Sequence, residues 1–229
     1  MAALERGTEL RWHDPFELIY NAAPSTHLSV VTAEPSGMHV ATMKWGLIPG
    51  WWRQQEPPKL TINARFEDAH NKPMWQAAFR GARCLVPAMG WYEWSTEGRV
   101  DTRTGEVSEV RQPYFIHLEG LAPLCFAGLW SQWRPDRNAE PLLTFSILTR
   151  PSSPALSRLH DRMPVVLPEG AYEEWLAPGN QDVESLRQLV RTRAADDFLA
   201  YTVSTYVNNP KNQRPDCLAP LPPATTKTK

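Results

Sequence analysis

The stretch that decides the fold class is RCLVPAMGWYEW, residues 83–94, an apolar run that ends in closely spaced aromatic side chains. Such residues favour β-strands. On a strand, Tyr92 and Trp94 point to one face, whereas Trp91 and Glu93 point to the other. The run therefore predicts a strand that places one carboxylate among aromatic rings, where desolvation raises its pKa toward the range useful for proton transfer. The alternative is that Glu93 simply pairs with an arginine.

Seven further β-type runs bounded by turn residues lie along the chain. They are Leu28–Val31, Val40–Leu47, Leu60–Phe66, Tyr114–Leu118, Leu124–Trp133, Leu142–Thr149 and Phe198–Val203. Helical signals are fewer, and they occur at Met74–Phe79, Glu169–Leu176 and Asp182–Thr192, with a short turn after Ser153. The pattern predicts a strand-dominated core with helices covering the outside of the sheet.

No linker rich in Gly and Ser or in one sign of charge divides the 229 residues, so we expect a single domain over residues 1–209. Residues 210–229 form a proline-rich tail, and we expect its last residues to be disordered. The polar segment Ser95–Gln112 contains Gly98 and Gly105. It predicts an extended hairpin loop outside the core.

The composition, with 42% hydrophobic and 21% charged residues, is ordinary for a soluble globular protein. The net charge of −1 excludes a global basic surface for duplex DNA, so any nucleic-acid site must be local. Cys84, Cys125 and Cys217 are widely spaced and odd in number, which predicts neither a disulfide framework nor a zinc site. The chain starts without the apolar segment of a signal peptide and contains no run of transmembrane length. We therefore expect a cytoplasmic protein without a metal, a cofactor or a membrane contact.

Three further groups of residues could carry chemistry. Asn63 and Arg65 are two apart on a predicted strand and point to one face, where they could hold a phosphate or a sugar. A turn-forming Asn and a surface Arg are the alternative. Trp51 and Trp52 follow a predicted turn, and exposed rings there would stack on bases unless they pack as a loop tip. His160 closes a turn and can titrate near neutrality, although a lone loop histidine is more often structural.

The sequence lacks G-x-S-x-G, a Walker lysine loop, HExxH and a dinucleotide fingerprint. Hydrolase, NTPase, zincin and Rossmann interpretations therefore lack their minimal chemistry.

Five sequence blocks, taken in order, resemble the SRAP (SOS response-associated peptidase) family. They are Tyr20–Pro24, Trp45–Trp52, Asn63–Arg65, Gly90–Trp94 and His160–Pro164. The resemblance implies an α+β fold, in which a curled, mainly antiparallel sheet forms an incomplete barrel with peripheral helices. It also implies a DNA-damage-response protein that recognises abasic sites in single-stranded DNA through a positively lined groove, and we expect a monomer.

In the family, an N-terminal Cys exposed by loss of Met attacks the aldehyde of the abasic site, and its α-amine and thiol close a stable thiazolidine ring. By similarity, Asn63 would orient the sugar or the N-terminus, and Glu93 would move protons at the nucleophile. His160 would be an acid or base on the ring-opened sugar. The DNA-binding residues implied by the resemblance are Pro24, Trp51 and Trp52 against bases, and Arg65 and Arg162 on phosphates.

This sequence departs from the family at its start, because Ala2 stands where the nucleophilic Cys should be. An α-amine at Ala2 could still attack an aldehyde, but without the thiol the adduct would stop at a reversible imine, which favours strand cleavage and hence lyase activity. Either the start is internal to a longer protein that begins with Met-Cys, or the chain is a divergent form. The persistence of Asn63, Glu93 and His160 favours the first. A non-covalent binding module for single-stranded DNA and an (auto)peptidase stay open as alternative functions.

Overall fold

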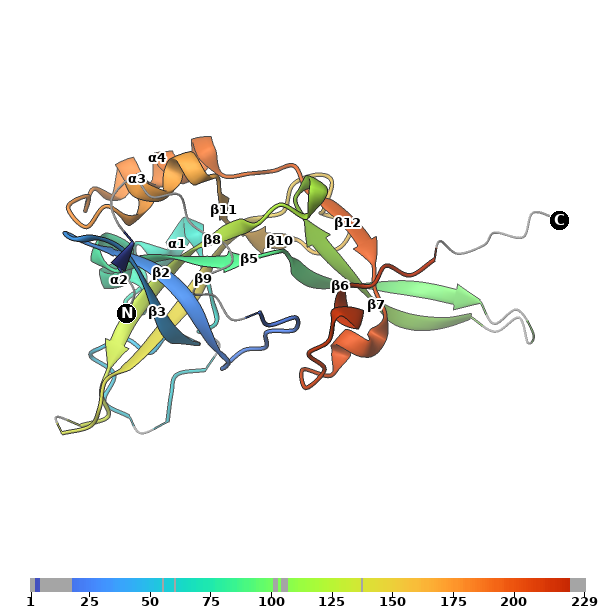
Figure 1. Ribbon diagram of the computed structural model, residues 1–229, viewed down its shortest axis with the longest axis horizontal. Helices are drawn as coiled ribbons and strands as arrows, with labels where there is room; N and C mark the ends of the chain where they lie inside the picture. The colour runs from blue at the N-terminus through green and yellow to red at the C-terminus, as the bar shows by residue number, and fades with distance from the viewer. Residues whose placement is uncertain are drawn as a thin grey trace.

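The computed structural model describes residues 3–4, 18–54, 56–59, 61–100, 103, 107–136 and 138–222. They form two sheets with short helices around them (Figure 1). No helix in this described part of the chain combines the length and the apolar character that crossing a bilayer requires.

The larger sheet has nine strands, along a hydrogen-bonded path that runs β1-β3-β2-β5-β8-β9-β10. The strands on this path are β1 (Ala3–Leu4), β2 (His27–Glu34), β3 (Gly37–Trp45), β5 (Arg83–Ala88), β8 (Leu124–Trp133), β9 (Leu142–Pro151) and β10 (Arg162–Pro164). Off the path, β4 (Asn63–Arg65) pairs with β9, and β11 (Val166–Leu167) pairs with β8. The pairings of β9 with β3 and β4 are parallel, and the others in this sheet are antiparallel.

The sheet curls until its strands meet. Lys44 and Trp45 at the end of β3 pair with Thr144 and Phe145 of β9, so that β3, β2, β5, β8 and β9 form a ring. The predicted fold class, α+β with a curled and mainly antiparallel sheet, is confirmed.

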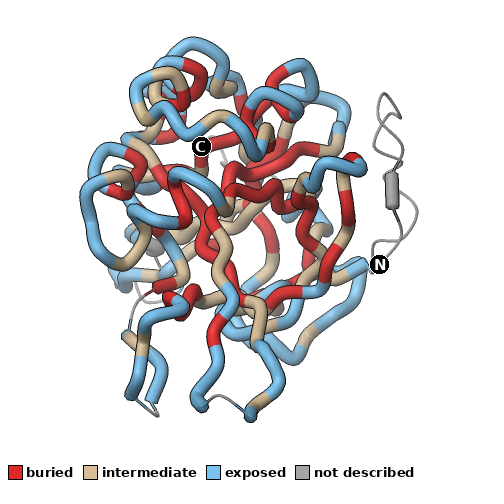
Figure 2. The backbone as a smooth tube through the Cα atoms, turned by 90° about the vertical axis from the view of Figure 1, so that its left-hand side faces the viewer, coloured by how far each residue is buried: buried red, intermediate tan, exposed pale blue. Residues whose placement is uncertain are grey.

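Both faces of the curled sheet are buried, because successive side chains along its strands pack alternately into two different hydrophobic clusters. Val31, Leu85 and Leu148 pack in one cluster with residues of the helices. Their sequence neighbours Val30 and Ile147 pack in the other, with side chains of the second sheet and of the turn before β10. Successive side chains of a strand point to opposite faces, so one strand serves both clusters. Figure 2 shows the buried segments gathered inside a shell of exposed loops.

The second sheet has the order β12-β7-β6, in which β6 (Trp91–Val100) and β7 (Val107–His117) form a long hairpin and β12 (Leu199–Thr202) pairs with β7 (Figure 1). We expected a hairpin loop at Ser95–Gln112. The hairpin is present, but both of its arms remain paired strand as far as Val100 and Val107. Charged and polar side chains are compatible with a two-stranded ribbon that extends away from the core. The polar composition therefore did not reveal that these residues form paired strands.

The helices match the predicted positions within a few residues. They are α2 (Gln76–Gly81), η2 (Glu169–Ala171) continued by α3 (Tyr172–Leu176), and α4 (Val183–Arg193). Asp182 caps α4, because its side chain accepts a hydrogen bond from the Glu184 amide. One α-helix was missed, and so were the short strands β10 and β11. α1 (Phe66–Ala69) directly follows β4 and begins at the last residue of the run Leu60–Phe66, which predicted only a strand. Four residues are too few to show a helical period.

The first part of the proline-rich tail packs on the second sheet. Three further short 3-10 helices are η1 (Glu119–Leu121), η3 (Thr205–Asn208) and η4 (Pro215–Leu218). The last of them, η4, lies in the tail and contains the buried Cys217. Val203 and Pro220 form an isolated β-bridge. The predicted disorder of the chain end falls on residues 223–229, which lie outside the described residues.

Candidate functional site

A pocket of about 670 Å³ opens where the curled sheet faces the second sheet. Its apolar floor belongs to the cluster that contains Phe126, Ile147 and Met163. Polar or charged residues that line the pocket are Tyr20, Asn21, His27, Ser29, Thr42, Asn63, Arg65, Tyr92, Glu93, Thr149, His160 and Arg162. The three residues predicted to be catalytic, Asn63, Glu93 and His160, thus share one cavity although they come from distant parts of the chain.

β4 supplies Asn63 and Arg65. Both are exposed and both line the pocket, whereas Ala64 between them is fully buried on the opposite side. Parallel pairing with Ile147–Thr149 of β9 sets this orientation. The expectation that Asn63 and Arg65 share a face is confirmed. Arg65 forms no ion pair with any residue that the structure describes.

Glu93 enters from the start of β6, where Trp91 packs against Phe126 and Phe198 at 6.0 and 5.0 Å between ring centroids. The chain turns into this strand at Gly90. A Cβ atom there would lie 2.2 Å from the Ile116 carbonyl oxygen, so this close approach requires glycine. Burial raises the pKa of Glu93 to about 7, against the attraction of His160 and with the help of Asp161. The predicted rise of this pKa is confirmed, and Glu93 can both donate and accept a proton near neutrality.

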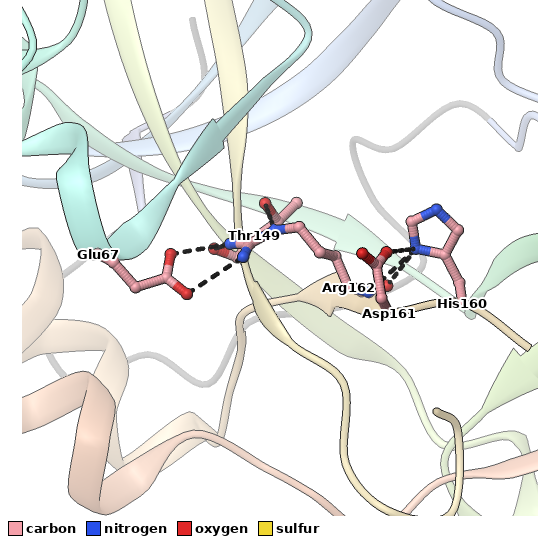
Figure 3. A network of polar contacts seen from close by, with 5 residues as sticks. All are labelled: Glu67, Thr149, His160, Asp161 and Arg162. Atoms are coloured by element: carbon pink, nitrogen blue, oxygen red, sulfur yellow. Dashed lines mark hydrogen bonds and ion pairs between the residues drawn. The ribbon is translucent and has the colours of Figure 1, made fainter. Parts of the chain in front are cut away.

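His160 closes a turn that leads into β10, and its side chain is half exposed. Its Nδ1 atom lies 3.0 Å from both the amide nitrogen and the carbonyl oxygen of Arg162, and 3.3 Å from the Asp161 carboxylate (Figure 3). Since these contacts all involve Nδ1, the other ring nitrogen, Nε2, has no hydrogen-bond partner among the described residues. The backbone therefore fixes one side of the imidazole and leaves the other for a ligand.

Arg162 is held firmly at the pocket wall. Its guanidinium donates to both carboxylate oxygens of Glu67, at 3.2 and 2.9 Å, and to Thr149 through Oγ1 at 3.2 Å and the carbonyl oxygen at 2.6 Å (Figure 3). Burial by itself would raise the pKa of Glu67, but the hydrogen bond and charge of Arg162, with the charge of Arg65, bring that pKa below its usual value. Glu67 is consequently ionised at neutral pH. Sequence reasoning missed Glu67 and Thr149, because a partner 95 residues away leaves no local signal.

The segment that carries Pro24 forms another wall of the pocket, and C-terminal residues hold it in place. The Tyr92 hydroxyl donates to the Tyr20 carbonyl at 2.9 Å. Asn21 donates through Nδ2 to the carbonyls of Val207 and Asn209, and its own carbonyl accepts from Gln213 at 2.8 Å. The segment Val207–Gln213 thus holds this wall of the pocket in place.

Trp51 and Trp52 do not line the pocket. They lie in the loop after β3, where Trp51 is 51% exposed and the two rings are tilted by 53° at 5.8 Å. The Trp52 indole donates to the Glu56 carbonyl, and its own carbonyl accepts from Trp133. Trp51 therefore offers an exposed ring outside the pocket lining, whereas the indole of Trp52 is hydrogen-bonded within the loop.

None of the three cysteines lines the pocket, and all are buried free thiols. Burial raises the pKa of Cys84 well above its usual value and that of Cys125 to about 12. A buried thiol is a poor nucleophile, and all three thiols are buried outside the pocket, so none of them replaces the absent Cys at position 2. Ala2 itself lies outside the described residues. Within those residues, no group of three or more His, Cys, Asp or Glu side chains is placed to hold a metal ion.

Comparison with known proteins decides the family. The family described as SOS response associated peptidase (SRAP) matches residues 2–210. The chain belongs to the SRAP family. Among its relatives, the abasic site processing protein YoqW of Bacillus subtilis is 36% identical over 200 residues, which cover 87% of this chain and 84% of that protein. The abasic site processing protein HMCES of Xenopus tropicalis is 29% identical over 238 residues, which cover 91% of this chain and 68% of that protein.

Solved structures agree with this assignment. A protein from Bacteroides thetaiotaomicron superimposes on this SRAP chain with a TM-score of 0.71 at 24% identity, covering 86% of this chain and 82% of the other. A phage-related protein from Bordetella bronchiseptica gives a TM-score of 0.58 at 31% identity and covers 80% of each chain. The SRAP fold is therefore shared with structures whose sequences differ at most positions.

Proposed function

We propose that this SRAP protein recognises abasic sites in single-stranded DNA and reacts with the ring-opened sugar in the pocket. The observation that carries the proposal is the convergence of Asn63, Glu93 and His160 on one cavity beside Arg65. The relatives named abasic site processing proteins supply the class of substrate. Binding and opening a sugar phosphate requires an amide, two groups able to transfer protons and a guanidinium, and the pocket contains all of these functional groups.

The chemistry follows from the aldehyde of the open sugar. In a form of the protein that starts at Met1, loss of this Met would expose the α-amine of Ala2, which would add to C1′ with loss of a molecule of water to form an imine. Glu93 accepts the proton from the attacking amine, and His160 serves the sugar oxygen as an acid or base. Because Ala2 has no thiol, a thiazolidine cannot form. Loss of a proton from C2′ and departure of the 3′ phosphate then cleave the strand, so a form that starts at Ala2 would act as a lyase, whereas a form that begins upstream with Met-Cys would close the thiazolidine ring.

The DNA contacts in this proposal are few. Arg65, which has no ion-pair partner among the described residues, holds one phosphate, and Arg162 contributes the donor that Glu67 and Thr149 leave unused. Pro24 packs beside the abasic position, and Trp51 and Trp52 stack on bases farther along the strand. We place this activity in a cytoplasmic monomer, for which the three free thiols give support through a reducing compartment.

Trapping with borohydride tests the proposal, because hydride reduces the imine to a stable amine that links protein and DNA. We expect an adduct with abasic single-stranded DNA and strand cleavage without borohydride. Asn63→Ala, Glu93→Gln and His160→Ala should each lower the rate by about tenfold or more. Asn71→Ala is the matched control, since Asn71 is an exposed asparagine outside the pocket. Absence of both adduct and cleavage in the unmodified protein would rule out the covalent function.

A second candidate is a module that binds single-stranded DNA without chemistry. The exposed ring of Trp51 and the side chain of Arg65, which has no ion-pair partner among the described residues, give support to it. Equal affinity for intact and abasic strands, together with no trapped adduct, would establish that function instead. An (auto)peptidase is the weaker candidate, because the three thiols are buried and a peptidase needs an activated nucleophile. A mass spectrum of the purified protein that shows cleavage within the chain would support it.

A further inference from the structure

Glu67 lies outside every motif that pointed to the pocket, yet it connects two parts of the pocket wall. It is the second residue of α1, which begins directly after the strand that carries Asn63 and Arg65. Its partner Arg162 is the first residue of β10, two positions after His160. β4 and β10 both pair with β9, and Thr149 of β9 faces Arg65 on one side and Pro164 on the other. The ion pair between Glu67 and Arg162 therefore bridges the two strands that flank β9.

The donors of Arg162 are almost fully occupied. A guanidinium has five N–H groups. Nε donates to the Thr149 hydroxyl, one N–H of Nη1 donates to Glu67, and Nη2 donates to both Glu67 and the Thr149 carbonyl. Only one N–H, on Nη1, has no partner among the described residues. A bidentate contact between Arg162 and a phosphate would require Arg162 to leave Glu67.

The contacts of Arg162 also extend to His160. The amide and carbonyl of Arg162 lie on Nδ1 of the imidazole, and the Asp161 carbonyl accepts a hydrogen bond from the Ser152 amide at 3.0 Å, which closes the base of the turn. Figure 3 shows the resulting row of contacts from Glu67 through Arg162 to His160. With a side chain only 19% exposed, Arg162 is shielded enough for Glu67 to control its position.

We propose that Glu67 is a positioning residue for this site. By fixing the guanidinium of Arg162, it holds the turn whose backbone orients His160, and it restrains Arg162 from binding phosphate as a free cation. Glu67 thus lowers the affinity of the protein for the DNA backbone and gives the imidazole of His160 a defined orientation. The inference rests on the proposed function for its effect on rate, but its effects on His160 and on DNA binding can be measured without any reaction.

The test compares Glu67→Ala and Glu67→Gln with Glu184→Ala. Glu184 is a matched control, because it is the second residue of α4, pairs with Arg187 and Arg191, and lies away from the pocket. For both Glu67 variants we expect about two- to fivefold tighter binding to intact single-stranded DNA. The slope of log K against log salt should become steeper by about 0.7, the increment for one more phosphate contact. The rate with abasic DNA at saturation should fall by about tenfold.

A spectroscopic measurement tests the orientation of the His160 imidazole directly. The ring nitrogen shifts of His160, observed in long-range ¹H–¹⁵N correlation spectra, should change in both Glu67 variants and stay unchanged in Glu184→Ala. Glu67→Gln keeps the shape of the side chain and one oxygen acceptor, so it serves if Glu67→Ala is too unstable to study.

Two results would overturn the positioning role. One is a parallel loss of affinity, rate and melting temperature, which would mean that Glu67 only supports the fold. The other is an unchanged His160 spectrum together with an unchanged salt slope. If the unmodified protein does not react with abasic DNA, the proposed function fails, and the spectrum and the salt slope alone decide the role of Glu67.

Discussion

Glu93 is the side chain whose surroundings most clearly serve chemistry. It lies among Trp91, Tyr92 and Trp94 at the pocket, and burial shifts its pKa upward because the aromatic walls exclude water from the carboxylate. Near neutrality it is divided between its neutral and ionised forms. A carboxyl group in that state can take a proton from an amine and return it within one reaction cycle.

The raised pKa of Glu93 makes stability depend on pH. The pKa is about 7 in the folded protein and about 4.3 in an unfolded chain, so the stabilisation is fully present below about pH 4.3 and is lost as the pH rises to 7. Relative to Glu93→Gln, the wild type should lose about 2 kcal/mol of unfolding free energy between pH 4 and pH 8, after allowance for solvent screening. Urea unfolding of both proteins across this range measures the difference. Parallel curves would contradict a raised pKa, since His160 and Asp161 are present in both proteins.

At the scale of elements, one buried arginine fastens helices to the curled sheet. Arg83 at the start of β5 donates to five carbonyls, which belong to Phe79, Arg80, Trp175, Ala177 and Asn180. The acceptors lie near the ends of α2 and α3, where helix carbonyls lack intrahelical partners. Burial lowers the pKa of Arg83 to about 10, so the side chain stays charged at neutral pH.

Replacement of Arg83 should therefore destabilise the protein even when the charge is kept. Lysine has three donors on one nitrogen and cannot reach five carbonyls arranged around a planar guanidinium. We expect Arg83→Lys to lose about 2–4 kcal/mol of unfolding free energy, because buried carbonyls remain unpaired. Arg80→Lys, at an exposed position of the same helix end, should change it by less than about 0.5 kcal/mol. Chemical denaturation measures both, and equal effects would show that the five contacts carry no special weight.

At the scale of the whole molecule, the net charge of −1 leaves DNA binding to a few local cations. We expect a slope of log K against log salt of about −1 to −2 for single-stranded DNA, which corresponds to one to three phosphate contacts. Arg65→Ala should make the slope shallower by about 0.7, whereas Arg80→Ala should leave it unchanged, since Arg80 does not line the pocket. Fluorescence anisotropy at several salt concentrations measures both. A steep slope in the wild type would mean that an extended basic surface exists elsewhere.

The elements of this molecule were largely predictable. β8 covers Leu124–Trp133 as expected, and α4 differs from the expected Asp182–Thr192 by one residue at each end. These segments carry long, regular patterns, which follow directly from the geometry of a strand or a helix. α1 and the paired arms of the hairpin after Ser95 were missed, the first because it is too short for a period and the second because its side chains are polar on both faces.

By itself, the sequence determined the alternation of strands, the helix positions, the residue types available for proton transfer and, through its motif order, the family. Only the tertiary structure decided which residues meet. The pairing of β4 and β10 with β9 brings Asn63 and His160 to one pocket and pairs Glu67 with Arg162, while the second sheet supplies Glu93 to that pocket; Trp51 and Trp52 stay outside it. Strand periodicity is local, whereas strand pairing joins residues that are far apart in sequence, and a period of two carries no information about partners.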